Sequence, residues 1–170
     1  IPFIALLAIL LLVSGCSTTD DEPKVSTEKE FYDAAQRMLN SSQWDPAIKN
    51  LQMLESNFPF GAYAEQAQLE LIFAYFKSNQ PEAAIAAADR FIRLHPQHRN
   101  VDYAYYMKGL TSYTQNQGIF ERFVPSDLTD RDPGAARESF AHFSQLIARY
   151  PDSQYVGDAR KRMIHLRNIL

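Results

Sequence analysis

The sequence has few of the features from which enzyme and metal sites are built. Its only cysteine is Cys16, which excludes a disulfide bond within the chain. It contains no His-Glu-x-x-His motif, no pair of cysteines, no glycine-rich phosphate loop and no Gly-x-Ser-x-Gly nucleophile motif. We therefore predict a protein that is not an enzyme and that uses no cofactor and no metal.

The charged residues and histidines also form no cluster that indicates a ligand. The net charge is −3, and without a concentration of Lys and Arg we expect no nucleic-acid partner. His95 and His98 flank Pro96 in a predicted turn, and a metal site at this pair is the disfavoured alternative. The Asp and Glu residues are scattered along the chain, so we expect them on solvated faces.

The one long apolar run covers residues 1–13, IPFIALLAILLLV. It is too short to cross a bilayer comfortably but has the length of a signal-peptide core. The basic start and the initiator Met expected before such a core are missing, so we expect residues 1–15 to be a signal peptide clipped at its N-terminus. Residues 13–16, Val-Ser-Gly-Cys, resemble the bacterial lipobox, which implies cleavage after Gly15 and lipid attachment to Cys16. A secretory core followed by a chance cysteine is the alternative.

Residues 16–27 are predicted to be the lipidated cysteine and a flexible tether, because the stretch is polar, acidic and contains a proline. Ser17 follows the cysteine, and in signals of this kind that residue implies transfer to the outer membrane. Two or more acyl chains hold a membrane durably, at about 0.8 kcal/mol per buried methylene group. Thr27 and Glu30 then have the spacing of a capping box, which predicts the start of a helix.

Residues 63–96 have the pattern of two antiparallel helices. Ser78-Asn79-Gln80 breaks the pattern, Pro81 suits the first turn of the second helix, and Pro96 ends that helix. Small and large residues face one another across the hairpin: Leu71, Ala74 and Tyr75 on the first helix, and Ala84, Ala88 and Phe91 on the second. The length of about 34 residues is that of a tetratricopeptide repeat.

The same helix stop recurs three times, at Phe58-Pro59, His95-Pro96 and Tyr150-Pro151. The three prolines are 37 and then 55 residues apart, so the third unit carries 18 extra residues. Residues 67–80 align with 104–117 without a gap and share an Asn-Gln turn.

These periods predict an all-α fold, a tetratricopeptide-repeat solenoid of stacked antiparallel helix pairs over residues 28–170. In such a fold each repeat buries its apolar face against its neighbours, so no single central core is needed. The expected repeats are 28–59, 63–96, 101–151 with an insertion at 118–134, and 155–170, which is the start of a fourth.

The first helices of the repeats are expected to line a concave groove. Counting from Glu28, Glu65 and Asp102 as the first positions, the groove positions are largely aromatic and carry little charge. Rings on a concave surface suit an extended peptide, because they offer a large contact area at low entropic cost. In the alternative, some of these rings fill the hairpin cores. The predicted groove residues are Tyr32, Gln66, Leu69, Phe73, Phe76, Tyr103, Tyr106 and Tyr113.

The insertion at residues 118–134 is too long for a tight turn, and it is rich in apolar residues. Phe120 and Phe123 flank Arg122, which favours a loop that contacts a partner. A loop that folds back on the solenoid is the alternative.

Several runs resemble the BamD (ComL) family of outer-membrane assembly lipoproteins over essentially the whole chain. They include LQMLESNFPFGAYAEQAQLELIFAY at 51–75, FERFVPSDLTDRDP at 120–133 and FAHFSQLIARYPDSQYVGDARKRM at 140–163. The resemblance implies a lipid-anchored scaffold on the periplasmic face of the bacterial outer membrane. It further implies partners: the periplasmic domains of BamA, the lipoproteins BamC and BamE, and unfolded β-barrel proteins that are folded and inserted into that membrane.

Two other classes of function remain open at this point. One is a repeat lipoprotein that scaffolds peptidoglycan or cell-division machinery, and its pull-down partners would be cell-wall synthases. The other is the helical arm of a lytic transglycosylase, which would require a catalytic domain downstream in the full-length gene.

Overall fold

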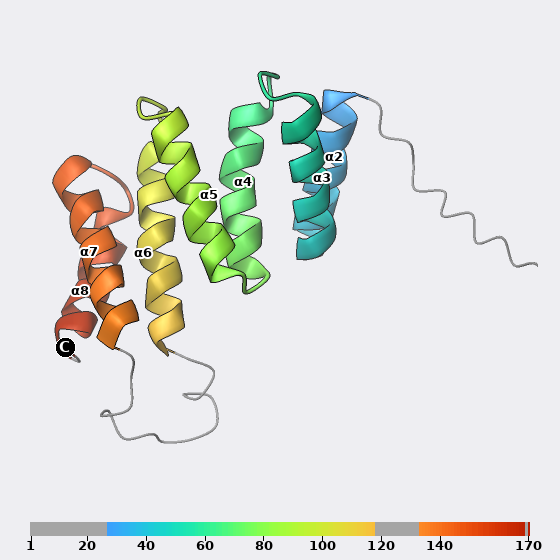
Figure 1. The fold of residues 1–170 in the computed structure, drawn as a ribbon. Coiled ribbons are helices and arrows are strands. Elements are labelled where there is room, and N and C mark those ends of the chain that lie inside the picture. Colours follow the sequence, from blue (N-terminus) through green and yellow to red (C-terminus); the bar gives the residue numbers. More distant parts are fainter. Residues whose placement is uncertain (1–26, 118–132, 169) are drawn as a thin grey trace, which may run out of the picture.

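Seven α-helices form the part of the chain that the computed structural model describes, residues 27–117, 133–168 and 170, and this part contains no strand. The helices stack side by side in chain order, each antiparallel to the one before it (Figure 1). Their bounds are α2 Glu28–Asn40, α3 Trp44–Asn57, α4 Ala64–Lys77, α5 Pro81–Leu94, α6 Val101–Gln117, α7 Pro133–Arg149 and α8 Val156–Arg167. The predicted all-α solenoid is confirmed.

The helix ends follow from local sequence. At the start of α2, the amide N of Glu30 donates to Thr27 Oγ1 at 3.2 Å and the Thr27 amide donates to Glu30 Oε2 at 2.9 Å, which confirms the capping box. Pro81 opens α5, where a missing N–H costs nothing. Ser42 and Asn79 take positive φ angles of 58° and 59° in the two tight hairpin turns.

One predicted turn is wrong. Asn116 and Gln117 align with the Asn79-Gln80 turn, but α6 continues through Gln117 and is 17 residues long, against 14 for α4. The insertion that follows removes the need for a tight turn there. At its other end α7 already begins at Pro133, inside the range expected for the insertion.

The core is divided between neighbouring hairpins, as a solenoid requires. One cluster joins α2, α3 and α4 around Leu51 and Leu54, and a second joins α4 to α8 around Phe91 and Phe143. Alanines with no exposed surface let the helices approach closely. At one point a glycine is required, because a Cβ on Gly109 would lie 2.5 Å from the Phe143 ring.

Each turn between repeats is held by an acidic residue at the start of the preceding first helix. Glu28 accepts from the Tyr63 amide at 2.6 Å, Glu65 lies 3.3 Å and 3.5 Å from His95 and His98, and Asp102 accepts from Ser153 Oγ at 2.7 Å. These are the three first positions of the sequence repeat. The prediction that the acidic residues lie on solvated faces holds for Glu65, which is exposed, whereas Glu28 and Asp102 are half-buried against the turns that they hold.

Candidate binding face

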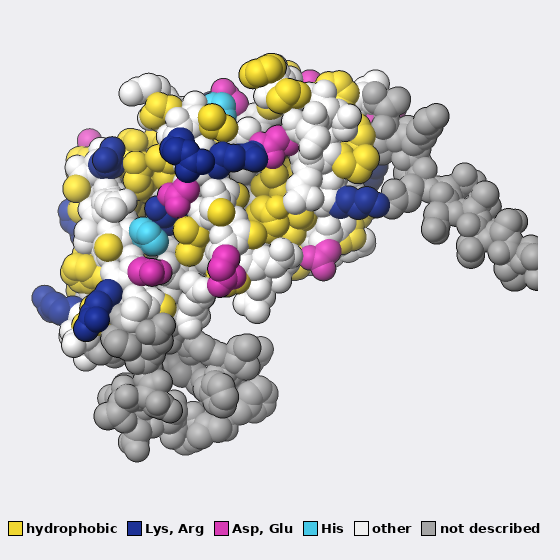
Figure 2. Space-filling view, in the orientation of Figure 1, with side chains coloured by type: hydrophobic (Ala, Val, Ile, Leu, Met, Phe, Trp, Pro, Cys, Tyr) yellow, Lys and Arg dark blue, Asp and Glu magenta, His cyan; other side chains and the backbone are white. Residues whose placement is uncertain are grey.

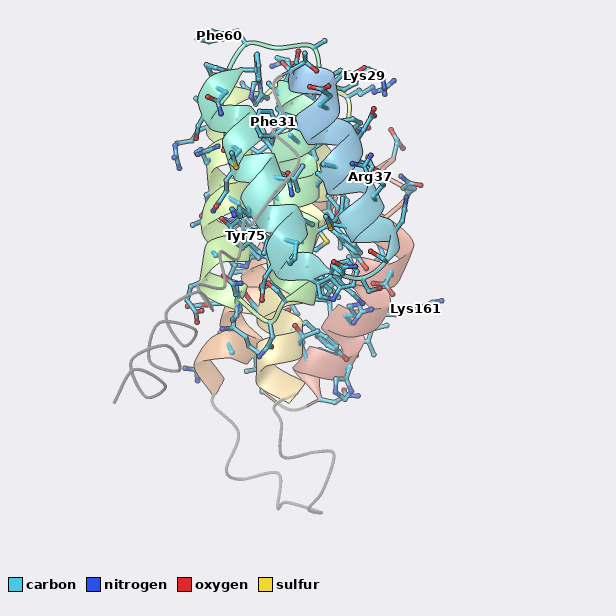
Figure 3. The ribbon with its side chains drawn as sticks, turned by 90° about the vertical axis from the view of Figure 1, so that its right-hand side faces the viewer. Lys29, Phe31, Arg37, Phe60, Tyr75 and Lys161 are labelled. Atoms are coloured by element: carbon cyan, nitrogen blue, oxygen red, sulfur yellow. The ribbon has the colours of Figure 1, made fainter. Side chains whose placement is uncertain are left out.

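The candidate site is the face formed by the first helices α2, α4, α6 and α8, which we call the first-helix face. Figure 3 shows this face along the right-hand side, where Lys29, Arg37 and Lys161 project. Side chains join successive first helices across it, α2 to α4 and α6 to α8. Of the predicted groove residues, Tyr32 and Tyr106 make these bonds.

The α2–α4 junction is built around Glu70. Its carboxylate accepts from Tyr32 Oη at 3.0 Å, Gln66 Nε2 at 2.9 Å and Gln36 Nε2 at 2.6 Å. Among the described residues, none of its partners in these bonds is a cation. The Tyr32 ring stacks on Tyr63 at 4.5 Å between centroids, and burial followed by the Glu70 charge raises the pKa of Tyr32.

The α6–α8 junction repeats this arrangement with one change. The Tyr106 ring stacks on Tyr155 at 4.7 Å, and its hydroxyl donates to Asp158 Oδ2 at 2.8 Å. Here the carboxylate also accepts from Arg162 Nε at 2.5 Å. Burial and the bond to Asp158 raise the pKa of Tyr106 to about 12. Burial alone would raise the pKa of Asp158, but the hydrogen bonds from Arg162 and Tyr106 outweigh it and lower that pKa.

The predicted groove residues differ in how much of each side chain a ligand could touch. Leu69 and Tyr113 are 4% and 7% exposed and belong to the core, so their side chains pack inside the solenoid. Phe76 and Tyr103 are half-buried against the same core. Phe73 is 37% exposed and lies edge-on to Trp44 at 5.8 Å, and Gln66 is exposed beside Glu70. The accessible part of the face thus centres on α4.

Sequence reasoning did not single out the residues that organise these junctions. Tyr63 and Tyr155 are the rings on which Tyr32 and Tyr106 stack. Glu70 and Asp158 accept the hydrogen bonds that the hydroxyls of Tyr32 and Tyr106 donate. The signal that could have found the first pair is their alignment, since both tyrosines directly precede a first helix. The acids lie at different places in their helices, so the alignment does not bring them together.

His95 and His98 take part in packing. Both rings lie against Phe91, at 5.0 Å and 5.2 Å between centroids, and His95 also lies 3.1 Å from the Gln68 amide oxygen. In the described part of the chain no group of three or more His, Cys, Asp and Glu residues is placed to hold a metal ion.

A second surface lies on the opposite side of the solenoid, between α3 and α5. A cleft of about 540 Å³ has Leu71 and Tyr75 of α4 among its lining residues and is bordered by the ion pair of Glu55 and Arg90. Figure 2 shows this side, with apolar side chains exposed near the middle and charged side chains above them. The prediction from sequence did not include this cleft.

Three further predictions fall on residues outside the described range. These are the signal peptide at 1–15, the lipid on Cys16 with its tether, and the partner loop with Phe120, Arg122 and Phe123. Among the described residues, no helix is both long and apolar enough to cross a membrane.

Residues 24–170 match the YfiO family model, whose description is outer membrane lipoprotein. The chain belongs to this family. Among similar proteins, the outer membrane protein assembly factor BamD of Vibrio cholerae is 42% identical over 164 residues, covering 96% of this chain and 68% of that protein. BamD of Neisseria meningitidis serogroup B is 40% identical over 166 residues, covering 94% of this chain and 62% of that protein.

The chain therefore spans between three fifths and seven tenths of the length of these two relatives. Their names describe assembly factors and not enzymes, in agreement with the prediction of a chain that performs no catalysis. The resemblance noted in the sequence to the BamD family is confirmed, and the outer membrane is the location that the family description gives.

Proposed function

We propose that this protein is a lipid-anchored scaffold of the β-barrel assembly machinery, held at the periplasmic face of the outer membrane through Cys16. The observation that carries the proposal is the match of residues 24–170 to outer membrane lipoproteins, together with relatives named as assembly factors. These names favour barrel assembly over a scaffold for cell-wall synthases or an arm of a transglycosylase. By the same resemblance its partners are BamA, BamC and BamE.

The first-helix face is proposed to hold an extended segment of an unfolded barrel protein. Such a segment has unpaired N–H and C=O groups and apolar side chains on one side, and it aggregates unless it is covered. On this face Glu70 accepts three hydrogen bonds, all from neutral donors among the described residues, so its charge is not paired with a cation there and about one of its four acceptor sites is left for an N–H group of a ligand. Phe73 beside it offers an exposed ring for an apolar side chain.

A photo-crosslinking amino acid placed at Phe73 in intact cells tests this proposal. Met53 of α3 is the matched control, because it is 39% exposed against 37% for Phe73 and lies on a second helix of a repeat. We expect crosslinks to unfolded barrel proteins from position 73 and far fewer from position 53. Equal yields from both positions, or none from position 73, would argue against a substrate-holding role for this face.

A charge-removing variant tests the role of Glu70 separately. Glu70→Gln keeps an oxygen acceptor and the shape of the side chain but removes the negative charge. We expect weaker binding of an unfolded barrel segment with unchanged helicity by circular dichroism. Unchanged binding by the folded variant would show that substrate binding does not use the charge of Glu70.

A further inference from the structure

The three turns between repeats have the same backbone hydrogen bonds. In each turn the amide two residues after the proline donates to the carbonyl of the residue before the proline, and a second bond opens the next helix. The first bonds are Gly61 N to Phe58 O at 3.0 Å, His98 N to His95 O at 3.1 Å and Ser153 N to Tyr150 O at 3.0 Å. The second bonds are Ala64 N to Gly61 O at 3.2 Å, Val101 N to His98 O at 3.0 Å and Val156 N to Ser153 O at 3.1 Å.

The residue after the proline differs among these turns, although the backbone does not. It is Phe60 in the first turn, Gln97 in the second and Asp152 in the third, and all three are exposed. Because Gln and Asp serve the same turn, the fold does not require an aromatic residue there. Phe60 is 99% exposed and touches essentially nothing within the protein.

The first turn is also the only one of the three without charge. Residues 58–63 read FPFGAY, whereas the second turn contains Arg99 and the third contains Asp152. A single exposed apolar residue is ordinary on a protein surface. Phe60 is different because an uncharged segment carries it at the end of the solenoid, where apolar side chains protrude over the α3–α4 turn (Figures 2 and 3).

The first turn is fixed to the start of the chain's first described helix. The Tyr63 amide donates to Glu28 Oε1 at 2.6 Å, and a Cβ on Gly61 would lie 2.1 Å from the same oxygen. A side chain at position 61 would therefore displace the Glu28 carboxylate, which is held against the Tyr63 amide because residue 61 is a glycine. As a result Phe60 is presented from a turn that is fastened to residue 28, and it lies at the end of the solenoid where α2 begins (Figure 1).

Cys16 precedes Thr27 by 11 residues, which span about 40 Å at most when fully extended. A lipid on Cys16 would thus keep the first turn permanently close to the bilayer surface, at a high effective concentration. We propose that the α3–α4 turn rests on the lipid headgroups of that membrane, with the Phe60 ring at the boundary between headgroups and acyl chains. The inference rests on the lipid anchor of the proposed function.

A lipid surface fits this turn for a chemical reason. Aromatic side chains favour the headgroup boundary, and apolar residues of surface-bound segments enter it by about 5–10 Å. Residues 58–63 bring no charged side chain of their own to that depth, and the Glu28 carboxylate at the turn is held by the Tyr63 amide. The second and third turns carry Arg99 and Asp152 and lack the ring, so the contact belongs to the repeat next to the anchor.

Tryptophan fluorescence tests the contact, because the chain has a single tryptophan, Trp44, at the other end of α3. Over 14 residues that end lies about 20 Å from the turn. The lipidated protein is reconstituted in vesicles of phosphatidylethanolamine and phosphatidylglycerol that carry a spin label near the headgroup or at the chain end. In Trp44→Phe/Phe60→Trp we expect loss of most emission with the headgroup label and a smaller loss with the deep label.

Two controls decide the outcome. Wild-type protein, which reports from Trp44, and Trp44→Phe/Gln97→Trp, which reports from the equivalent position of the second turn and leaves its Arg99 in place, should both keep their emission. If flotation shows that the protein binds the vesicles but the tryptophan emission from position 60 is not quenched, the inference is wrong. Phe60 would then be a contact for a protein partner. Equal quenching at positions 60 and 97 would also overturn it. If the protein does not float at all, the lipid anchor itself is wrong, and the inference fails with it.

Discussion

The junctions α2–α4 and α6–α8 solve one packing problem with different electrostatics. In both, a tyrosine of one first helix stacks on the tyrosine that precedes the next, and its hydroxyl donates to a carboxylate. In the second junction Arg162 neutralises that carboxylate, whereas Glu70 in the first has only neutral donors among the described residues. The ion pair thus stabilises the α6–α8 junction, whereas the α2–α4 junction keeps a carboxylate charge that a ligand can contact.

The first and third turns between repeats also differ in how an acidic side chain is bonded to them. Glu28 reaches the Tyr63 amide directly, while the shorter Asp102 reaches its turn through Ser153, whose hydroxyl in turn accepts from the Tyr155 amide at 3.2 Å. Glu28 is one methylene group longer than Asp102, so it reaches the backbone amide of its turn without a bridging serine. The first junction therefore depends on one residue and the third turn on a relay of two.

The largest expected loss of unfolding free energy comes from removing the Phe143 ring, which packs beneath the α6–α8 junction. Phe143 has no exposed surface and lies 6.1 Å from the Tyr106 ring. We expect Phe143→Ala to lower the free energy of unfolding by about 3–5 kcal/mol, through lost burial and the cavity left behind. Denaturant unfolding measures the loss, and hydrogen exchange should show α6–α8 losing protection before α2–α4. Equal loss in both halves would contradict the division of the core.

The next effect concerns Glu28. In Glu28→Ala the Tyr63 amide loses its acceptor, which we expect to cost about 1–2 kcal/mol in unfolding free energy. Glu28→Gln keeps an oxygen acceptor and should cost less than half as much. Faster hydrogen exchange at the Tyr63 amide in the alanine variant alone would locate the effect. A loss of the same size in both variants would show that the charge, and not the hydrogen bond, holds the turn.

Removing one hydroxyl from each stack compares the junctions directly. Tyr32→Phe and Tyr106→Phe should each lower the unfolding free energy by about 0.5–1.5 kcal/mol, the range for one ordinary hydrogen bond, because each carboxylate keeps other donors when the hydroxyl is removed. The loss should be smaller at Tyr106, because Arg162 still pairs with Asp158. Denaturant unfolding of the two variants side by side checks the order, and a larger loss in Tyr106→Phe would reverse our interpretation of Arg162.

The smallest effect is a pH dependence specific to the second junction. The pKa of Asp158 lies below its ordinary value of 3.8, so its contribution is present at neutral pH and is lost as the pH falls through the lowered pKa. Its side chain is 44% exposed, which limits the contribution to about 0.5–1 kcal/mol. Asp158→Asn should flatten the acid limb of the stability curve by that amount. An unchanged acid limb in this variant would place the pH dependence elsewhere.

The helices were predictable because their signals are local. The Ser78-Asn79-Gln80 break, Pro81 and the repeated residue-proline stops act within one or two turns of helix, and the period of the alanines sets the hairpin faces. The two helix ends beside the insertion were missed: Asn116-Gln117 resembles a turn but has no tight connection to make, and α7 begins at Pro133 within the predicted insertion.

The binding face was less accessible to sequence reasoning, since it depends on contacts between repeats. Leu69 and Tyr106 occupy the same repeat position, yet Leu69 is buried while Tyr106 reaches a carboxylate 52 residues away. The residue before the next first helix also differs: it is Asn100 after Leu69, and after Tyr106 it is Tyr155, on which the Tyr106 ring stacks. Spacing within a repeat does not contain that information.

The bond from Glu28 to Tyr63 has a mechanical consequence. A pull applied through the N-terminal segment enters α2 at its first residue, where the load is shared with a turn 35 positions further along the chain. Peeling of the leading helix from its first residue therefore has to break this bond as well, at a cost of about 1–2 kcal/mol, before the helix can unwind.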